Sequence, residues 1–291
     1  MKSEEARKIA DDALARLSEG LKAGRSEQLL AYLTAMAKFH RYSIHNLILI
    51  VCQRPDATHV AGFHTWKQLG RFVRKGEKGI LILAPMLLRK SEDDVDPGDT
   101  QEKRRVLRFR AVYVFDVSQT DGKPLPDTVR FAGDPSGHLD RLRRTIAGAG
   151  ITVDYGGVPP GADGVSTGGR IGLRPGMAPA EEFAVLVHEY AHECLHRGDD
   201  RPKSKKVRET EAEAVAFVVS TAIGLEAKTA SSDYISLYDG DDDVLAASLD
   251  RIQRTAAEMM VAILGEPERT PERESADTLM SAGADCRSNS R

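Results

Sequence analysis

The stretch His188-Glu-Tyr-Ala-His-Glu-Cys-Leu-His196 follows an apolar run, Phe183-Ala-Val-Leu-Val187, and most strongly constrains the expected fold. The spacing predicts one helix, on which His188 and His192 lie four residues apart and project from the same face. Two imidazoles placed in this way hold a single divalent ion, with Glu189 beside them as a general base. The stretch therefore predicts a hydrolytic metal centre of the His-Glu-x-x-His type.

Such a centre needs a third protein ligand and an open position for water. The helix predicted over 204–221 carries Glu209 and Glu213 on one face and is otherwise largely apolar, so its acidic stripe needs a partner. The register Glu209-Thr-Glu-Ala-Glu213 resembles the E-x-x-[SA]-[DN] motif of zincins that use a downstream glutamate. The resemblance implies that Glu209 is the third metal ligand and that Glu213 orients a ligand histidine from outside. Glu211 is about 200° away around this helix, and we expect it in solvent.

The remaining site residues follow from the chemistry of a zinc peptidase. Two imidazoles and a carboxylate favour Zn²⁺, which lowers the pKa of bound water to about 7, and Glu189 accepts the proton as the water attacks a carbonyl. His196 is expected to support the ligands rather than to close the site as a fourth ligand. Tyr234 and Tyr238 are both candidates for stabilising the oxyanion. The alternative is an amphipathic helix whose histidines only complete the core or the surface, and the compatible Glu209 disfavours it.

A second pattern lies in the first half of the chain, where basic residues surround the only tryptophan, Trp66. The basic residues are Lys67, Arg71, Arg74, Lys75 and Lys78, and Arg104, Arg105, Arg108 and Arg110 are expected to extend their surface. A positive groove with aromatic rings is typical of proteins that bind single-stranded nucleic acid without sequence preference. The alternative is a solvated loop with Trp66 in the core, and the charges alone do not decide between the two.

Four motifs occur in order along the first half of the chain: Tyr42-Ser-Ile-His-Asn46, Trp66-Lys-Gln68, Val73-Arg-Lys-Gly-Glu-Lys-Gly79 and Val114-Phe-Asp-Val-Ser-Gln119. Together they resemble the N-terminal single-stranded-DNA-binding domain of the ArdC antirestriction family. The second half resembles the metallopeptidase domain that follows in that family, which is related to ImmA/IrrE-like peptidases. The resemblance covers roughly residues 25–265 and implies that Tyr42, Asn46 and Trp66 contact DNA together with the basic residues. ImmA/IrrE-like relatives usually have asparagine where this chain has Glu213.

Composition sets the broad class. The 291 residues are 41% hydrophobic with a net charge of -3, which is typical of a soluble chain with room for two domains. Three cysteines without a C-x-x-C pair indicate a reducing compartment. The first residues lack the apolar segment of a signal peptide, and no apolar run is long enough to span a membrane. We therefore predict a cytoplasmic protein with no membrane partner.

These patterns together predict an α+β fold of two domains. Residues 1–127 are expected to combine N-terminal helices with a small antiparallel sheet in an ArdC-like domain that binds single-stranded DNA. Residues 128–265 are expected to form a mainly helical, zincin-like metallopeptidase domain with a short sheet, and 266–291 a disordered tail. Helices are expected over 4–22, 26–40, 44–51, 137–149, 178–197, 204–221 and 241–264, and strands over 80–84, 106–117, 152–155 and 170–173.

The predicted function is that of a zinc-dependent metallopeptidase coupled to a DNA-binding domain, with an antirestriction or mobile-element role. The alternative, from another class, is a non-catalytic antirestriction protein that binds single-stranded DNA and whose metal site is structural or vestigial.

Overall fold

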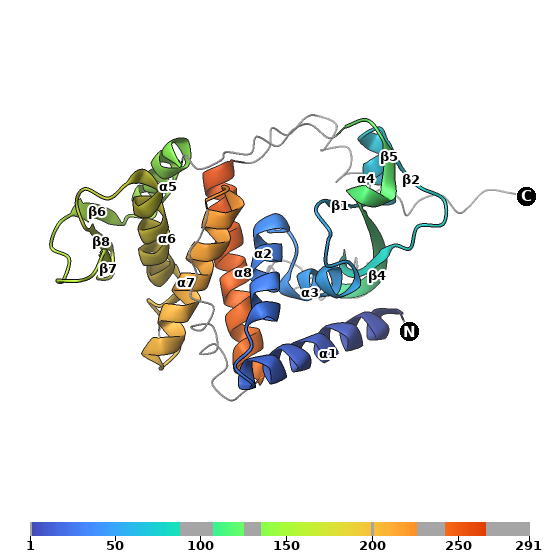
Figure 1. Cartoon of the computed structure of the whole chain (residues 1–291), viewed down its shortest axis with the longest axis horizontal. Coiled ribbons are helices and arrows are strands. Elements are labelled where there is room, and N and C mark those ends of the chain that lie inside the picture. The colour runs from blue at the N-terminus through green and yellow to red at the C-terminus, as the bar shows by residue number, and fades with distance from the viewer. Residues whose placement is uncertain (1, 88–106, 125–134, 199–200, 226–241, 266–291) are drawn as a thin grey trace, which may run out of the picture.

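The computed structural model describes residues 2–87, 107–124, 135–198, 201–225 and 242–265. Within these ranges the chain is a mixed α+β protein, with helices in its centre and small sheets toward both ends of the long axis (Figure 1). The mixed fold class predicted from the sequence is confirmed at this level.

The N-terminal helices are α1 (Lys2–Lys22), α2 (Glu27–Lys38) and α3 (Ile44–Gln53). Small and apolar residues recur along α1 at helical spacing and are fully buried: Ala6, Ala10, Ala13, Leu17 and Leu21. The helix α3 begins after Ser43, whose Oγ accepts a hydrogen bond from the backbone N–H of Asn46. These helices coincide with the three predicted over 4–22, 26–40 and 44–51 to within a few residues.

An antiparallel sheet of order β1-β4-β3 packs against these helices. Its strands are β1 (Val60–Gly62), β3 (Ile80–Leu87) and β4 (Leu107–Asp116). A separate pair consists of β2 (Arg71–Val73) and β5 (Thr120–Gly122), next to the short helix α4 (Phe63–Gln68). The sequence predicted β3 and β4 but missed β1, β2 and β5, because three residues are too few for an alternating pattern to emerge.

The C-terminal part has a mixed sheet of order β6-β8-β7, in which β6 is parallel and β7 antiparallel to β8. Its strands are β6 (Thr152–Tyr155), β7 (Gly164–Ser166) and β8 (Arg170–Leu173), and they follow the helix α5 (Ser136–Gly148). The helix α6 (Pro179–Leu195) packs against β7 and β8. Strand β7, which the sequence did not predict, therefore lies at the edge of the sheet and directly beside the His-Glu-x-x-His helix.

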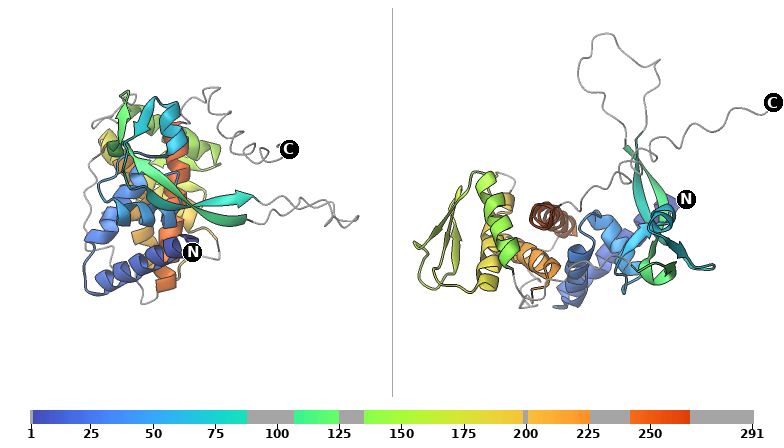
Figure 2. Two further views of the ribbon diagram at one scale, coloured as in Figure 1. Left: turned by 90° about the vertical axis from the view of Figure 1, so that its right-hand side faces the viewer. Right: turned by 90° about the horizontal axis from the view of Figure 1, so that it is seen from above.

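Two long helices connect the parts: α7 (Lys205–Ala222) and α8 (Asp242–Leu264). The helix α7 contacts α6, α8 and the N-terminal helix α2, and Figure 2 shows α8 next to the N-terminal helices from a second direction. The Gln253 side chain on α8 donates hydrogen bonds to the backbone oxygens of His40 (3.1 Å) and Tyr42 (2.7 Å). Buried apolar residues of both halves form one cluster. The domain boundary predicted between residues 127 and 128 falls outside the described residues and stays a prediction.

Several predictions fall on parts of the chain that the structure does not describe. They are the disordered tail at 266–291, the oxyanion candidates Tyr234 and Tyr238, and the basic residues Arg104 and Arg105, together with the side chain of Arg108. Among the described helices, none combines the length and the apolar character needed to cross a membrane.

Candidate metal centre

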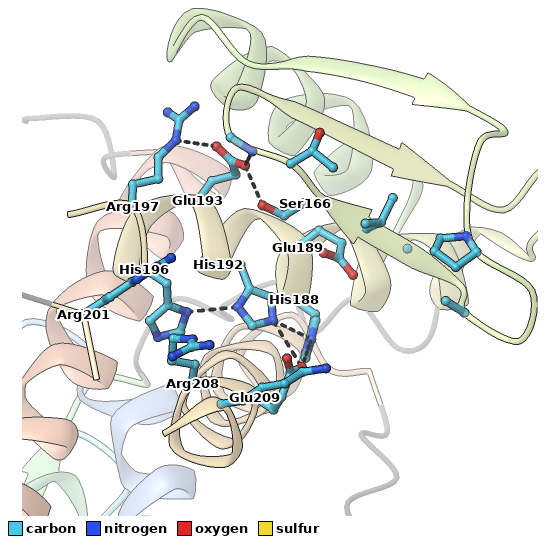
Figure 3. Close-up of a pocket in the computed structure, with 17 residues that line it drawn as sticks. Ser166, His188, Glu189, His192, Glu193, His196, Arg197, Arg201, Arg208 and Glu209 are labelled. Carbon is cyan, nitrogen blue, oxygen red and sulfur yellow. Dashed lines mark hydrogen bonds and ion pairs between the residues drawn. The ribbon is translucent and has the colours of Figure 1, made fainter. Parts of the chain in front are cut away.

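The helix α6 brings the two motif histidines together as the spacing predicts. Phe183, Leu186 and Val187 are fully buried and fix one face of the helix against the core. The Nε2 atoms of His188 and His192 lie 3.2 Å apart, on the face that looks toward α7 (Figure 3). Both imidazoles are partly exposed at the wall of a cavity.

Glu209 on α7 completes a group of three potential ligand atoms. Its Oε2 lies 3.4 Å from Nε2 of His192 and 3.7 Å from Nε2 of His188. Ligand atoms bound tetrahedrally at about 2.1 Å are separated by about 3.4 Å, so the three atoms are spaced as a single small divalent ion requires. Within the described residues, this group alone has the composition and spacing of a metal site. The three residues predicted as ligands thus fit a divalent metal ion.

Glu189 lines the same cavity next to His188 and lies against β7 (Figure 3). Its side chain is 7% exposed, and burial raises the pKa of its carboxyl group, although the backbone N–H of Ser166 donates a hydrogen bond to it. A Cβ at Gly164 would approach Glu189 Cγ and Oε1 to 2.7 Å, so β7 passes close to Glu189 because residue 164 has no side chain. Strand β7 and Glu189, the candidate general base, are therefore in close contact.

The cavity has a volume of about 820 Å³ and opens beside the three ligand atoms. One wall is the segment from Gly164 to Gly168. The other includes Arg201, which precedes α7, and Lys205 and Arg208 at the start of α7. The ligand group and Glu189 thus line one and the same cavity.

Charges within the ligand group are strongly coupled. Burial lowers the pKa of His188, but hydrogen bonds with Glu209 and Glu213 outweigh this effect and raise it to about 9. Burial, followed by the charge of His188, lowers the pKa of His192 to about 4. A hydrogen bond from His188 is the main cause that lowers the pKa of Glu209 to about 2. The carboxylates of Glu209 and Glu213 thus favour a positive charge on His188. His192 stays neutral and keeps a nitrogen lone pair, as a metal ligand requires.

Glu213 contacts the outer nitrogen of His188, as expected for a group that orients a ligand: its Oε2 lies 3.4 Å from Nδ1. His196 lies beside His192, with 2.9 Å between their Nδ1 atoms, and its Nε2 points away from the ligand group. Both residues lie next to the two histidines and outside the group of three, and their supporting roles stay predictions.

The prediction for Glu211 is wrong. This residue is 0% exposed, and its carboxylate contacts His196 and Arg251 rather than solvent. The sequence argument assumed that the face of α7 opposite Glu209 is open to water, but α8 covers it. Burial alone would raise the pKa of the Glu211 carboxyl, yet hydrogen bonds with His196, Arg251 and Ser248 outweigh it and lower the pKa.

Glu193 is a further residue of this site that the sequence did not single out. Its buried carboxylate accepts hydrogen bonds from the Ser166 hydroxyl and from the backbone N–H groups of Gly168 and Gly169, the latter two each 2.9 Å long. Arg197, one turn along, pairs with it at 2.8 Å. Glu193 thereby fixes the turn after β7 to α6, and the only sequence signal was an acid directly after the second motif histidine.

The residues predicted to contact DNA do not share one surface. Trp66 is 2% exposed and its Nε1–H donates to the backbone oxygen of Phe115, so the prediction that this ring stacks on bases is wrong for this structure. Asn46 is buried and its amide pairs with the backbone of Leu83 on β3. The Tyr42 hydroxyl donates to the backbone oxygen of Val60. These three side chains hold the fold together.

The predicted basic residues divide into two groups. Arg71 donates hydrogen bonds to the hydroxyl and backbone oxygen of Thr120 and to the backbone oxygens of Gly122 and Lys123. Arg74 pairs with Glu77 at 2.8 Å and with Asp121 at 3.4 Å. Lys67, Lys75 and Lys78 are exposed. Exposed aromatic rings occur on the same elements, with Phe63 on α4 at 51% and Phe72 on β2 at 57% exposure. Stacking rings are therefore available here, but they are not the ring that the sequence pointed to.

The fold has solved counterparts. Residues 3–115 match the family described as the N-terminal domain of anti-restriction factor ArdC. The crystal structure of metal-free antirestriction protein ArdC from plasmid R388 aligns with a TM-score of 0.53 and 20% identity, covering 88% of this chain and 98% of that one. The Mn(II)-bound structure of the same protein aligns with a TM-score of 0.53 and 19% identity, covering 89% of this chain and 99% of that one. The chain therefore has a mixed α+β fold similar to that of ArdC over most of its length.

Two relatives that are similar in sequence carry the description of uncharacterised proteins. A Bacillus anthracis protein, pXO2-81, is 24% identical over 311 aligned positions that cover 89% of this chain and 51% of the relative. The protein y4eC of Sinorhizobium fredii is 29% identical over 136 positions, covering 45% of this chain and 43% of the relative. The chain thus spans about half the length of the curated relatives it matches.

Proposed function

We propose that this protein is a metal-dependent peptidase whose N-terminal half binds single-stranded DNA, and that it acts in antirestriction as an ArdC-like protein. The observation that carries the proposal is the convergence of His188, His192 and Glu209 at one point of an open cavity, with Glu189 beside them. Neighbouring helices supply these side chains, and their ligand atoms have the spacing that one divalent ion needs.

His188, His192 and Glu209 would hold the ion, and the ion when bound supplies Lewis acidity toward a carbonyl and toward water. Two imidazoles and a carboxylate suit Zn²⁺ and also accept Mn²⁺. One structure of the R388 protein is Mn(II)-bound, which makes manganese a second candidate for this chain beside the zinc expected from its ligands.

Glu189 is the proposed general base. Because burial raises the pKa of its carboxyl, Glu189 is a better proton acceptor than an exposed carboxylate. A water that attacks a peptide carbonyl next to Glu189 loses its proton to the carboxylate, which then returns the proton to the leaving amine. The backbone N–H of Ser166 holds the Glu189 side chain in place during both transfers.

A peptide fits this cavity because of β7. The strand lies at the edge of the sheet, and its residues Gly164 to Ser166 line the cavity together with the ligands. An extended peptide that adds to the edge of a sheet gains backbone hydrogen bonds without a demand on its side chains. Such a peptide would pass in front of His188 and Glu189, which favours peptide hydrolysis over hydrolysis of a small molecule.

The DNA-binding part of the proposal rests on the surface around α4 and β2, where Lys67, Lys75 and Lys78 are exposed together with Phe63 and Phe72. Cations that meet phosphates and rings that stack on unpaired bases are the two elements of sequence-tolerant single-strand binding. This segment lies within residues 3–115, which match the ArdC N-terminal domain. The match supports an antirestriction role.

The test is cleavage of a mixture of synthetic peptides, read by mass spectrometry, with protein loaded with Zn²⁺ or Mn²⁺. Glu189→Gln should keep its metal and lose about 10²–10⁴-fold in rate, because general-base catalysis contributes an effect of this size. Glu181→Gln is the matched control, since Glu181 is an exposed residue of the same helix outside the cavity. Equal cleavage by Glu189→Gln and wild type, or none by metal-loaded wild type, would contradict the peptidase proposal.

A further inference from the structure

The two ligand histidines are supported from outside in different ways. Nδ1 of His188 faces Glu213, which is partly exposed. Nδ1 of His192 instead faces a second histidine, His196, which is buried and continues to a fully buried carboxylate, Glu211. We propose that Glu211 and Arg251 are positioning residues for the metal centre, and that they act on His192 through His196. This inference deepens the proposed function, because it assigns how one of its ligands is held.

If a metal ion binds to Nε2 of His192, these contacts allow a single arrangement of protons. Nε2 of His192 belongs to the ligand group and must keep its lone pair, so a neutral His192 carries its hydrogen on Nδ1. That hydrogen is donated to Nδ1 of His196, 2.9 Å away. His196 then carries its own hydrogen on Nε2 and donates it to Oε2 of Glu211 at 3.0 Å. The proton pattern that Glu211 imposes on His196 is therefore the one that leaves Nε2 of His192 free for a metal.

Arg251 on α8 fixes the other end of this chain. Its Nε lies 3.1 Å from Oε1 of Glu211, and its Nη2 also contacts this oxygen. The same guanidinium donates to the Ser248 hydroxyl at 3.0 Å. Each oxygen of Glu211 thus has its own partner, so the carboxylate cannot rotate without the loss of a hydrogen bond. Three helices, α6, α7 and α8, contribute to one connected network.

A carboxylate that holds a ligand histidine through its second nitrogen is a recurrent way to set the tautomer and the orientation of that ligand. In this chain a second imidazole is inserted between ligand and carboxylate. The insertion places the fully buried Glu211 away from the cavity, between α7 and α8, where it pairs with the partly exposed Arg251. The metal centre is thereby connected to α8, the helix whose Gln253 contacts the N-terminal half.

The experiment measures the affinity of metal-stripped protein for Zn²⁺ and Mn²⁺ by competition with a chromophoric chelator. Glu211→Met removes the acceptor for His196, and we expect the affinity to fall by about 10–100-fold. Glu211→Gln keeps an acceptor oxygen and should lie between this variant and wild type. The double variant Glu211→Met/Arg251→Met also removes the guanidinium that has lost its carboxylate partner, so it should unfold at a higher temperature than Glu211→Met while its metal affinity stays low.

The double variant separates positioning from simple structural support. If its metal affinity returns to the wild-type value together with its thermal stability, the network only holds the helices together and the proposal is overturned. Gln253→Met is the matched control on α8, because it removes hydrogen bonds from the same helix without touching Glu211. An equal loss of metal affinity in Gln253→Met would mean that the packing position of α8, and not the hydrogen bonds to His196, determines the affinity.

A second readout needs neither metal nor catalysis. Nitrogen-15 NMR of the imidazoles in metal-free protein should show the hydrogen on Nδ1 of His192 and on Nε2 of His196 in wild type, and a mixture of tautomers in Glu211→Met. Unchanged tautomers in Glu211→Met would overturn the inference. Since these signals do not depend on peptide cleavage, an inactive wild-type protein with the expected tautomers would refute the proposed function and leave the positioning of His192 intact.

Discussion

The sequence predicted a metal site around α6 and α7 and a DNA-binding surface around α4 and β2. The two regions differ in how many of the predicted side chains come together in the structure. In the first, residues from two helices converge on one point of a cavity. In the second, Trp66 and Asn46 are buried as parts of the fold, and only some of the predicted basic residues remain at the surface. Residue spacing on a helix therefore predicts which side chains meet better than composition within a loop-rich segment predicts which side chains are exposed.

The largest effect that bears on this contrast is expected from Trp66. Trp66→Ala should destabilise the protein by about 3–5 kcal/mol, because it removes a large buried side chain. Trp66→Phe keeps most of the volume and loses the hydrogen bond to Phe115, which costs about 1 kcal/mol. Chemical denaturation measures both values. A Trp66→Phe protein of unchanged stability whose affinity for single-stranded DNA collapses would restore the stacking role that the structure denies.

Asp116 provides the next largest effect, again in the N-terminal half. It is 1% exposed and accepts hydrogen bonds from the backbone N–H groups of Thr58, His59 and Ser118. Burial raises the pKa of its carboxyl, but the Ser118 hydroxyl and these N–H groups outweigh it, so the net shift is downward from 3.8. Asp116→Asn should cost about 1–3 kcal/mol at neutral pH.

The sign of the pH effect follows from the lowered pKa of Asp116. Its ionised form stabilises the folded state above the unfolded pKa, and this contribution is lost as the pH falls through the lower folded pKa. The difference in stability between wild type and Asp116→Asn should therefore shrink below about pH 4, the ordinary range of this group. If the difference stays constant through the acid range, Asp116 acts by its shape and not by its charge.

The smallest effect concerns the exposed lysines. Lys75→Ala with Lys78→Ala should weaken binding of single-stranded DNA and reduce the salt slope of log K by about 0.7 for each phosphate that is no longer neutralised. Fluorescence anisotropy of a labelled oligonucleotide at several salt concentrations provides the slope. Lys206→Ala, an exposed lysine on α7, is the control. An identical slope in the double variant and in wild type would place the DNA surface elsewhere.

The sequence predicted those parts of the molecule that depend on local geometry. His188 and His192 approach each other because residues four apart share a helix face, and Glu209 follows from the same rule on the next helix. The role of Glu211 was missed because α7 is covered by α8, and no local pattern reveals which faces of a helix neighbouring helices occupy. Trp66 was misjudged for the same reason, since basic residues next to a ring do not show whether the ring points outward or into the core. Strand β7 was missed because it has only three residues.

The metal centre is tested most simply by a metal titration of chelator-stripped protein with Zn²⁺ and Mn²⁺, read by isothermal calorimetry. We predict one ion per chain in wild type, with an affinity that falls by more than about a hundredfold in both His192→Ala and Glu209→Gln, since loss of a ligand exceeds the loss of an outer hydrogen bond. Glu181→Gln should bind like wild type. Binding of equal stoichiometry and affinity in all four proteins would contradict the assignment of His188, His192 and Glu209 as the metal centre.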